Sequence, residues 1–398
     1  GTIKAALMAT ARPIFQAPGN PYPWRSQGAG AVNASAALEY ILNASRKDGA
    51  LPDLLLPVPS DLPFSPLVTL FQGQHIGFNL SLVSSGAFQI NSSLSEILLS
   101  MISFPTTLQT FGGTSLLPIW FSIPKGCELG LYTGVFTLST DRDIELVVNV
   151  SFEVKKPVFS VLFDETKSGL VNEIQDVDLS ENSIQDSWGK TSFLFGAYRE
   201  IFFSAAKQGI SFSPHRTGSL DNLSFLSEFD SVILADPATR LSGNFTDWID
   251  ATVDTTLGFS SSEIDALRSL VVTKGKNLII LISYPAMTNV SEINRLLADF
   301  NLTYVAGHVS SRLSFSGQPG SNLLTTNVDN IDYIGGMLKG DRFLGTLWGR
   351  NDKMSENGFA SWHNPAGGNL LVSGSSFFLS NLALISSKVA SNNSLFAL

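Results

Sequence analysis

Histidine and cysteine, which most often bind metals or act as nucleophiles, are few and scattered in this chain. The histidines are His75, His215, His308 and His363. None of them has the spacing of a metal site, and we interpret all four as structural. The single cysteine, Cys127, cannot form a disulfide within the chain. These residues therefore predict no metal centre.

Carboxylate and amide oxygens alternate in one acidic stretch, residues 176–182 (Asp-Val-Asp-Leu-Ser-Glu-Asn). Alternating oxygen ligands suit calcium, but Glu181 stands where the calcium loop of an EF-hand needs glycine. A solvated acidic loop is the favoured interpretation, and calcium remains the alternative. No glycine-rich phosphate loop follows a predicted strand, so we expect no organic cofactor.

Asparagine indicates the compartment better than cysteine does. Ten of the 24 asparagines begin an Asn-x-Ser/Thr sequon, about twice the number expected by chance from the serine and threonine content. This excess predicts a glycosylated protein outside the cell or on its surface. Asn33 is the weakest acceptor, because we expect its side chain to cap a helix. The other candidates are Asn43, Asn79, Asn91, Asn149, Asn222, Asn244, Asn289, Asn301 and Asn392.

Composition narrows the class of protein further. The 398 residues are 44% hydrophobic and 15% charged, with a net charge of −9. No basic stripe is available to displace counterions from a nucleic acid, and no apolar run is long enough to span a membrane. An exported protein of this size without disulfides must rely on its cores, as we expect more often of archaeal or bacterial surface proteins. The length predicts two or three domains.

The first forty-odd residues predict two short helices. Apolar or small residues recur at helical spacing from Ile3 to Ala11, and Pro13 then ends the pattern. A second helix is predicted to begin after Asn33 and to run to about Leu42, with Ala34, Ala37, Leu38 and Ile41 as its apolar stripe. Helices this short are marginal in water by themselves, so we expect them to need a partner.

These helices carry the clearest resemblance in the chain. The pattern Ile-Lys-x-Ala-Leu-Met-x-Thr-Ala from Ile3, followed by Gly-x-Gly-x-Val-Asn-Ala-x-x-Ala-Leu from Gly28, resembles the last two helices of subtilisin-like serine proteases, the subtilases. The resemblance implies that residues 1–45 close a subtilase-like catalytic domain. It also implies that the nucleophilic serine belongs to a Gly-Thr-Ser-Met-Ala-x-Pro segment upstream of these helices.

The catalytic triad of that family is not expected in this chain. Subtilase catalysis needs Asp, His and Ser side chains that converge, and the family takes all three from upstream segments. Gly113-Thr114-Ser115 imitates the nucleophile motif, but Pro118 is one residue too close and the segment follows the closing helices. We interpret Ser115 as an ordinary serine of a loop or strand edge, and we predict no catalytic residue here.

The next part of the chain predicts a linker and an antiparallel β-sandwich. Residues 46–66 contain several prolines and are predicted as the linker. Between 67 and 158 the apolar residues alternate with a period of two, as in half-buried strands. The turn Pro124-Lys125-Gly126, with the following Gly130–Gly134, resembles the late hairpin of fibronectin-type modules that often follow subtilase domains.

Residues 159–398 predict an α/β domain with a mostly parallel sheet. Strand signals at Phe159–Phe163, Ser231–Ala235, Leu278–Ile282 and Asn369–Val372 alternate with helix signals, one of which opens at Ser260. The order of these elements resembles the glutamine-amidotransferase-like domain that follows the catalytic domain in the site-one protease branch of subtilases. An amidotransferase needs a cysteine after the third of these strands, where this chain has Ser283-Tyr284-Pro285.

Three functions remain open from the sequence. The first is the non-catalytic C-terminal portion of an exported subtilisin-like endopeptidase whose catalytic segment precedes this chain in one precursor and cleaves polypeptides. It predicts exposed apolar faces at Leu7 and at Leu38–Leu42. The second is a glycosylated cell-surface structural or binding protein derived from a subtilase, with other surface proteins as partners. The third, a hydrolase that uses α/β-domain residues, is the least favoured.

Overall fold

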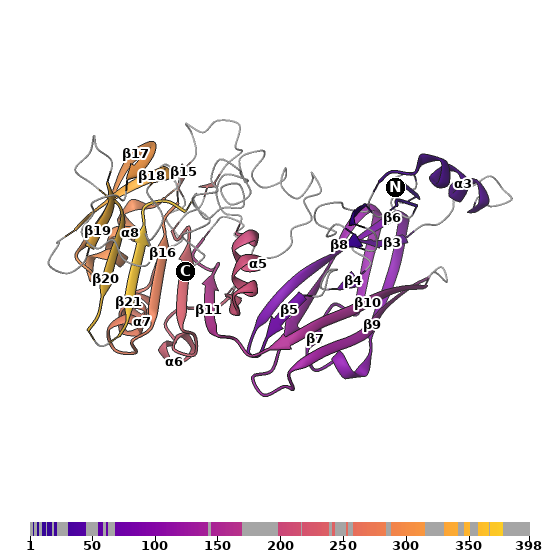
Figure 1. Ribbon diagram of the computed structural model, residues 1–398, viewed down its shortest axis with the longest axis horizontal. Coiled ribbons are helices and arrows are strands. Elements are labelled where there is room, and N and C mark those ends of the chain that lie inside the picture. The colour runs from indigo at the N-terminus through magenta and orange to yellow at the C-terminus, as the bar shows by residue number, and fades with distance from the viewer. Residues whose placement is uncertain are drawn as a thin grey trace. The chain divides into compact units, whose positions relative to one another are not determined.

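The chain divides into two compact units, which we describe separately (Figure 1). Unit 1 contains Gly1–Lys156, and unit 2 contains the described residues from Pro157 onward. The computed structural model describes residues 3, 6–7, 10–12, 14–17, 20–21, 31–44, 55–58, 61–62, 68–141, 145–168, 198–215, 217–238, 241–242, 252–253, 258–283, 288–314, 330–340, 346–350, 357–365 and 367–376.

Unit 1 begins with the two predicted helical segments. Ile3, Ala6 and Leu7 are helical, and α3 spans Ala34–Ala44. The Asn33 side chain accepts a hydrogen bond from Ala36 N at 3.1 Å, which confirms the predicted cap. Between the two segments, Arg12 pairs with Ala31, and Thr10 Oγ1 lies 3.5 Å from Asn33 O. A short hairpin lies in the connection and consists of β1 (Phe15–Ala17) and β2 (Asn20–Pro21).

The buried stripe of α3 differs from the predicted one. Ala37 is buried and Ile41 is half-buried, as expected, but Ala34 and Leu38 are exposed. The buried side of α3 is therefore narrower than the predicted stripe and leaves the Leu38 side chain in solvent.

The rest of unit 1 is one eight-stranded sheet with the order β4-β10-β9-β6-β8-β7, in which β3 pairs with β6 and β5 with β10. A 3-10 turn, η1 (Glu96–Leu98), follows β6. The strands are β3 (Leu55–Val58), β4 (Asp61–Leu62), β5 (Val68–Phe71), β6 (His75–Leu94), β7 (Ile102–Ser103), β8 (Thr107–Ser122), β9 (Gly130–Thr140) and β10 (Glu145–Lys155).

This sheet folds over onto itself. The first part of β6 pairs with β8 and its last five residues pair with β9, with a break in register between Ser84 and Ala87. The Phe121 ring on β8 and the Phe152 ring on β10 meet edge to face at 5.4 Å. Three strand spacings separate β8 from β10, about 14 Å in a flat sheet, so the contact requires two facing layers.

Two short strands lie inside the segment that the sequence predicts as a linker. β3 pairs antiparallel with β6, and β4 pairs in parallel with β10. Residues 55–58 and 61–62 therefore belong to the sheet, which corrects the linker prediction for them. Prolines here do not prevent pairing, because both strands are short and each uses few backbone donors.

Unit 2 is built on a nine-stranded sheet with the order β12-β11-β13-β16-β21-β20-β18-β17-β19. The first five strands of this order are parallel, and the last four pair antiparallel. β14 (Leu241–Ser242) and β15 (Thr252–Val253) form a separate pair. The sheet contains β11 (Phe159–Asp164), β12 (Ile210–His215), β13 (Ser231–Ala235), β16 (Asn277–Leu281), β17 (Leu302–Ser314), β18 (Asn330–Gly340), β19 (Thr346–Arg350), β20 (Asn357–His363) and β21 (Asn369–Ser373).

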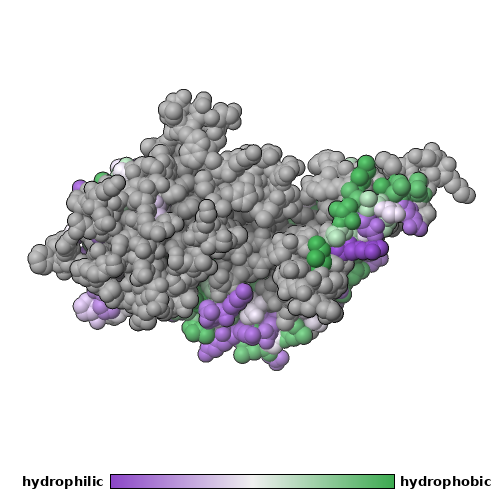
Figure 2. Space-filling view, turned by 45° about the horizontal axis from the view of Figure 1, so that its top comes forward, coloured by the Kyte–Doolittle hydropathy of each residue, from purple (hydrophilic) through white to green (hydrophobic). Residues whose placement is uncertain are grey.

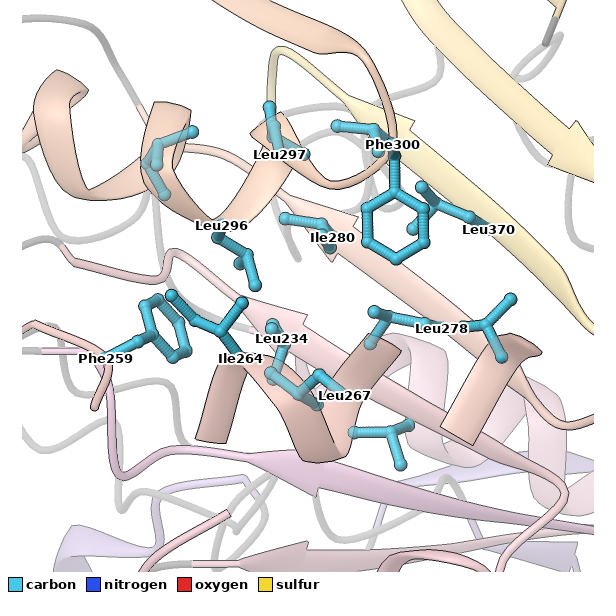
Figure 3. Close-up of a cluster of buried hydrophobic side chains, with 14 of the residues drawn as sticks. Leu234, Phe259, Ile264, Leu267, Leu278, Ile280, Leu296, Leu297, Phe300 and Leu370 are labelled. Carbon is cyan, nitrogen blue, oxygen red and sulfur yellow. The ribbon is translucent and has the colours of Figure 1, made fainter. Parts of the chain in front are cut away.

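Helices cover both faces of the parallel part. These are α5 (Arg199–Lys207), α6 (Leu223–Leu226), α7 (Ser261–Val272) and α8 (Val290–Ala298). One core joins strand residues such as Leu234 and Ile280 to Leu267 of α7 and Leu296 of α8 (Figure 3). Phe163 points to the opposite face, where its ring lies 5.4 Å from that of Tyr198, just before α5.

The sheet is mixed, where the sequence predicts a mostly parallel one. The unexpected antiparallel strands include β18, whose Gly335 and Gly336 weaken the strand signal. These glycines allow close packing, since a Cβ on Gly336 would lie 2.4 Å from the Tyr304 ring and one on Gly335 would lie 2.4 Å from Gly374 O. The described residues thus form a β-rich protein with several sheets.

Candidate functional site

The parallel strands of unit 2 reverse their order next to β11. The chain passes from β11 to β12 on one side and then to β13 on the other, so a switch point lies between β11 and β13. Open α/β sheets commonly bind ligands outside the carboxyl ends of the strands at such a point. Asp164 ends β11 and Asp236 directly follows β13, which makes these two carboxyls the natural candidates.

Asp236 is fully buried and satisfied by hydroxyl groups. Tyr198 OH donates to Oδ2 at 2.7 Å and Ser376 Oγ donates to Oδ1 at 2.5 Å. Ser283 lies beside the carboxyl, but its Oγ is outside hydrogen-bonding geometry. Burial raises the pKa of Asp236 to about 6, although the hydroxyl groups act to lower it. The backbone of Asp236 has a left-handed φ of 48°, which turns the chain away from the strand.

Asp164 is also buried, with 1% of its surface exposed. Its Oδ1 accepts hydrogen bonds from Thr166 Oγ1 at 2.8 Å and Thr166 N at 3.3 Å, and its Oδ2 accepts from Lys167 N at 3.3 Å. Burial raises the pKa of Asp164 to about 6, and these hydrogen bonds and the Lys167 charge oppose the increase. Two carboxyls at neighbouring strand ends therefore change charge near neutral pH.

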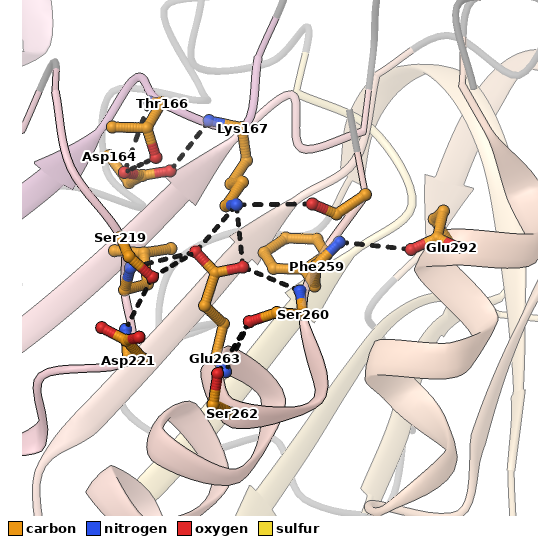
Figure 4. Close-up of polar contacts among 12 residues, drawn as sticks. Asp164, Thr166, Lys167, Ser219, Asp221, Phe259, Ser260, Ser262, Glu263 and Glu292 are labelled. Atoms are coloured by element: carbon orange, nitrogen blue, oxygen red, sulfur yellow. Dashed lines mark hydrogen bonds and ion pairs between the residues drawn. The ribbon is translucent and has the colours of Figure 1, made fainter. Parts of the chain in front are cut away.

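Lys167 connects this edge of the sheet to α7 (Figure 4). Its Nζ lies 2.8 Å from both carboxylate oxygens of Glu263 and 3.3 Å from Gly258 O. Glu263 also accepts hydrogen bonds from Ser219 Oγ, Leu220 N and Ser260 N. Burial acts to raise the pKa of Glu263, but these partners outweigh it and lower the pKa to about 2. The network ties three separate segments together.

His215 lies at the end of β12, next to β11. Its Nε2 is buried without a hydrogen-bond partner, and its ring lies 5.4 Å from that of Phe225. Burial lowers the pKa of His215, and the nearby Lys167 charge lowers it further. The imidazole is therefore held neutral beside the Phe225 ring and the Lys167 charge.

Chemically, this edge can hold and release protons near neutral pH, which is the property that general acids and bases need. A nucleophile is less evident. Ser283 follows β16, where an amidotransferase would need a cysteine, and it is completely buried. Cys127 belongs to unit 1, where burial raises its pKa and so disfavours the thiolate. Among the described residues, no group of three or more His, Cys, Asp or Glu side chains could hold a metal ion.

Three of the other residues singled out from the sequence have local partners in the described part of the structure. His75 Nδ1 pairs with Ser122 Oγ at 2.6 Å, and His363 Nδ1 pairs with Asn369 Oδ1 at 2.6 Å. Ser115 pairs with Leu82 inside the β6–β8 ladder, so it is a strand serine. The side chain of His308 and the candidate calcium segment 176–182 lie outside the described residues.

The sequon asparagines occupy two kinds of position. The side chains of Asn222 and Asn289 cap α6 and α8, as Asn33 caps α3. Asn91 and Asn149 are exposed on strands, and Asn301 is exposed with a left-handed φ of 54°. The Asn43 and Asn79 side chains, and the whole of Asn244 and Asn392, lie outside the described part.

The sheet edge that carries Asp164 and Asp236, here called the carboxyl edge, was not predicted as a functional site, although the sequence contains a signal for it. Asp164 and Asp236 both follow apolar strand runs, and adjacent parallel strands bring their carboxyl ends to one edge. Their partners are harder to foresee. Tyr198 is 38 residues from Asp236 in the chain and Ser376 is 140 residues away.

Comparisons with known proteins leave the family open. No protein-family model matches the chain, and no curated protein matches it. A family 123 glycoside hydrolase from Clostridium perfringens aligns with 59% of this chain and 45% of its own length, at 13% identity and a TM-score of 0.25. Tripeptidyl peptidase 2 aligns with 40% of this chain and 14% of its own, at 18% identity and a TM-score of 0.20.

A third similar structure is the PapD-like domain 7 of human CEP192, which aligns with 23% of this chain and 79% of its own length at 14% identity. Its TM-score is 0.19. Scores this low establish no common fold, so none of these similarities contributes to the functional argument. No helix in the described ranges is long and apolar enough to cross a membrane.

Proposed function

We propose that this chain is the non-catalytic C-terminal portion of an exported subtilisin-like serine endopeptidase. In this proposal the triad belongs to an upstream catalytic segment of the same precursor, which hydrolyses peptide bonds in polypeptide substrates. Residues 1–45 would close that catalytic domain. Unit 1 would add a fibronectin-type-like module, and unit 2 an amidotransferase-like accessory domain as in the site-one protease branch.

One observation carries the proposal, the apolar surface around α3. Leu38 and Leu42 lie one turn apart on the same side of the helix and are 58% and 64% exposed. Ile3 and Val32 are 70% and 72% exposed, and Leu7 is partly exposed. Figure 2 shows hydrophobic surface, in green, at the end of unit 1 that carries α3. Several exposed apolar side chains on short helices are typical of a surface that another part of a protein covers.

The resemblance to subtilases indicates which part of the precursor would cover the apolar surface around α3. The Ile3–Ala11 and Gly28–Leu38 patterns resemble the closing helices of a subtilase domain, which pack against the rest of that domain. The Leu38 and Leu42 side chains would then be buried by the catalytic segment. Burying one leucine contributes about 1.5–3 kcal/mol, so two of them would account for a stable contact.

The test uses the whole precursor and a pair of matched variants. A fluorophosphonate probe should label the catalytic segment of the wild-type precursor. Leu38→Asp combined with Leu42→Asp should abolish this labelling, because two charges would be buried without partners where these helices close the catalytic domain. Leu129→Asp, at a leucine that is also 58% exposed, should leave it unchanged.

Two results would overturn the protease proposal. One is a precursor whose upstream sequence lacks the Asp, the His or the Gly-Thr-Ser segment. The other is full labelling of the double aspartate variant by the probe. The first result would favour the glycosylated surface protein, for which a second apolar surface in unit 1, on β9 and β10, supplies the supporting observation.

A further inference from the structure

The outer face of β9 and β10 in unit 1 exposes apolar side chains. Leu131 and Val135 on β9 are 62% and 37% exposed, and Val147 on β10 is 56% exposed. All three lie on one side of the folded sheet, because the buried positions alternate with them along each strand. Exposed apolar strand residues are a liability for aggregation unless something covers them.

Two sequon asparagines lie on this same face. Asn149 is directly opposite Val135 in the β9–β10 ladder, and Asn91 of β6 is directly opposite Ser139 in the β6–β9 ladder. Residues that are directly opposite each other in a sheet project from the same side. The Asn91 and Asn149 side chains are both exposed.

The register places Val147 between the two asparagines. Val147 is opposite Thr137, which lies two residues from Val135 and two from Ser139 along β9. The rows that contain Asn149 and Asn91 are therefore the immediate neighbours of the row that contains Val147. Each asparagine is about 7 Å along the strands from that row, well within the span of an attached oligosaccharide.

The asparagine and the hydroxyl residue of each sequon lie on this face. Because side chains alternate along a strand, Ser93 and Ser151, the hydroxyl residues of the two sequons, project from the same side as Asn91 and Asn149. The asparagine side chains of three other sequons cap helices. The two sequons on this face differ from those three in lying along strands.

We propose that Asn91 and Asn149 carry N-linked glycans that cover the apolar outer face of β9 and β10. The inference rests on the export in the proposed function. In the transfer, the asparagine Nδ2 bonds to the anomeric carbon of a lipid-diphosphate-linked oligosaccharide. The bond from that carbon to the diphosphate oxygen breaks, the lipid diphosphate leaves with the electron pair, and the amide proton passes to a base.

The first test maps glycans on the native protein. Enzymatic release in H₂¹⁸O converts each glycosylated asparagine to a labelled aspartate, which peptide mass spectrometry locates. We expect the label at Asn91 and at Asn149. Bare Asn91 and Asn149 would overturn the inference, whether or not Asn222 or Asn301 carries a glycan. The fluorophosphonate result does not depend on glycans, so it tests the proposed function separately.

Variants test the covering role. Asn91→Gln and Asn149→Gln should each remove the mass of one glycan, and the double variant should bind an apolar dye more strongly and self-associate. Ser93→Thr, which keeps the acceptor sequence of Asn91, serves as the matched control and should leave dye binding unchanged. Adding Val147→Thr to the double variant should reduce its dye binding again. Equal dye binding by the wild-type protein and the double variant would show that the glycans leave this face open.

Discussion

At the residue scale, the two buried aspartates of unit 2 lower its free energy of unfolding when they ionise. Raising the pKa of a carboxyl from 3.8 to about 6 means that the folded protein binds a proton more tightly than the unfolded chain does. The stability from each group is fully present below pH 3.8 and is lost as the pH rises through about 6. At neutral pH the loss is about 3 kcal/mol for each aspartate.

The prediction at this scale concerns the pH dependence of unit 2. Between pH 5 and pH 7.5, each aspartate should reduce the free energy of unfolding by about 1 kcal/mol. Asp236→Asn removes one of the two titrating groups and keeps an acceptor for Tyr198 or Ser376, so it should roughly halve this decrease. Urea denaturation of the two proteins at both pH values measures it.

Asp230→Asn is the control for this experiment. Burial acts to raise the pKa of Asp230, but hydrogen bonds from Ser160 and the ion pair with Lys276 lower it overall. This carboxyl is therefore ionised in both the folded and unfolded states above pH 5, and its removal should leave the slope unchanged. A wild-type stability that increases from pH 5 to pH 7.5 would contradict the assigned burial of the aspartates.

At the scale of elements, the Lys167–Glu263 pair fixes the start of α7. Ser260 and Glu263 form a complete capping box, and Glu263 also holds Lys167 from the segment after β11 and Leu220 from the segment before α6. A carboxylate that is 2% exposed depends on all of these partners. The start of α7 therefore connects, through hydrogen bonds and an ion pair, loops that are far apart in sequence.

Glu263→Gln tests the contribution of the Lys167–Glu263 pair to stability. It leaves the Lys167 ammonium without its counter-ion, so we expect a loss of about 3 kcal/mol in the free energy of unfolding at pH 7. The loss should shrink as the pH falls from 4.5 towards 2, where Glu263 of the wild-type protein itself becomes protonated. Denaturation curves at several pH values measure both effects.

Asp265→Asn is the matched change, because it neutralises an exposed carboxylate on the same helix. It should cost less than about 0.5 kcal/mol. Similar losses from the Asp265 and Glu263 variants would mean that the Lys167–Glu263 pair contributes little.

Among the helices and strands, some were predicted from the sequence and others were missed. The capping box at Ser260 and the apolar runs of β13 and β16 act locally, and these elements form where they were predicted. β17 and β18 were missed, because their strand character depends on close packing that Gly335 and Gly336 permit. The carboxyl edge was missed because its hydrogen bonds join residues that only the sheet order brings together.

At the scale of the whole molecule, each unit has its own core. Unit 1 packs Phe121, Phe136 and Phe152 inside its folded sheet, whereas the core of unit 2 lies between its sheet and helices. Two cores of this kind need not unfold together. We therefore expect calorimetry of the intact chain to show two transitions.

Gly374→Ala should lower only one of them. A Cβ at Gly374 would lie 2.4 Å from Gly336 O, so the backbone of unit 2 must shift at a cost of about 1–3 kcal/mol. Gly307→Ala adds a Cβ with no atom within 4 Å and should change neither transition. If the Gly374 variant lowered both transitions equally, the two cores would be unfolding as one.

The position of β21 has a consequence for the order in which unit 2 can be assembled. β21 comes last in sequence among the nine strands of its sheet, yet it lies inside the sheet between β16 and β20. During synthesis, the parallel strands and the antiparallel strands form two separate groups, and β16 and β20 lack their shared partner until Asn369–Ser373 leaves the ribosome. A nascent chain is therefore exposed to mispairing at both edges until its final strand joins the halves.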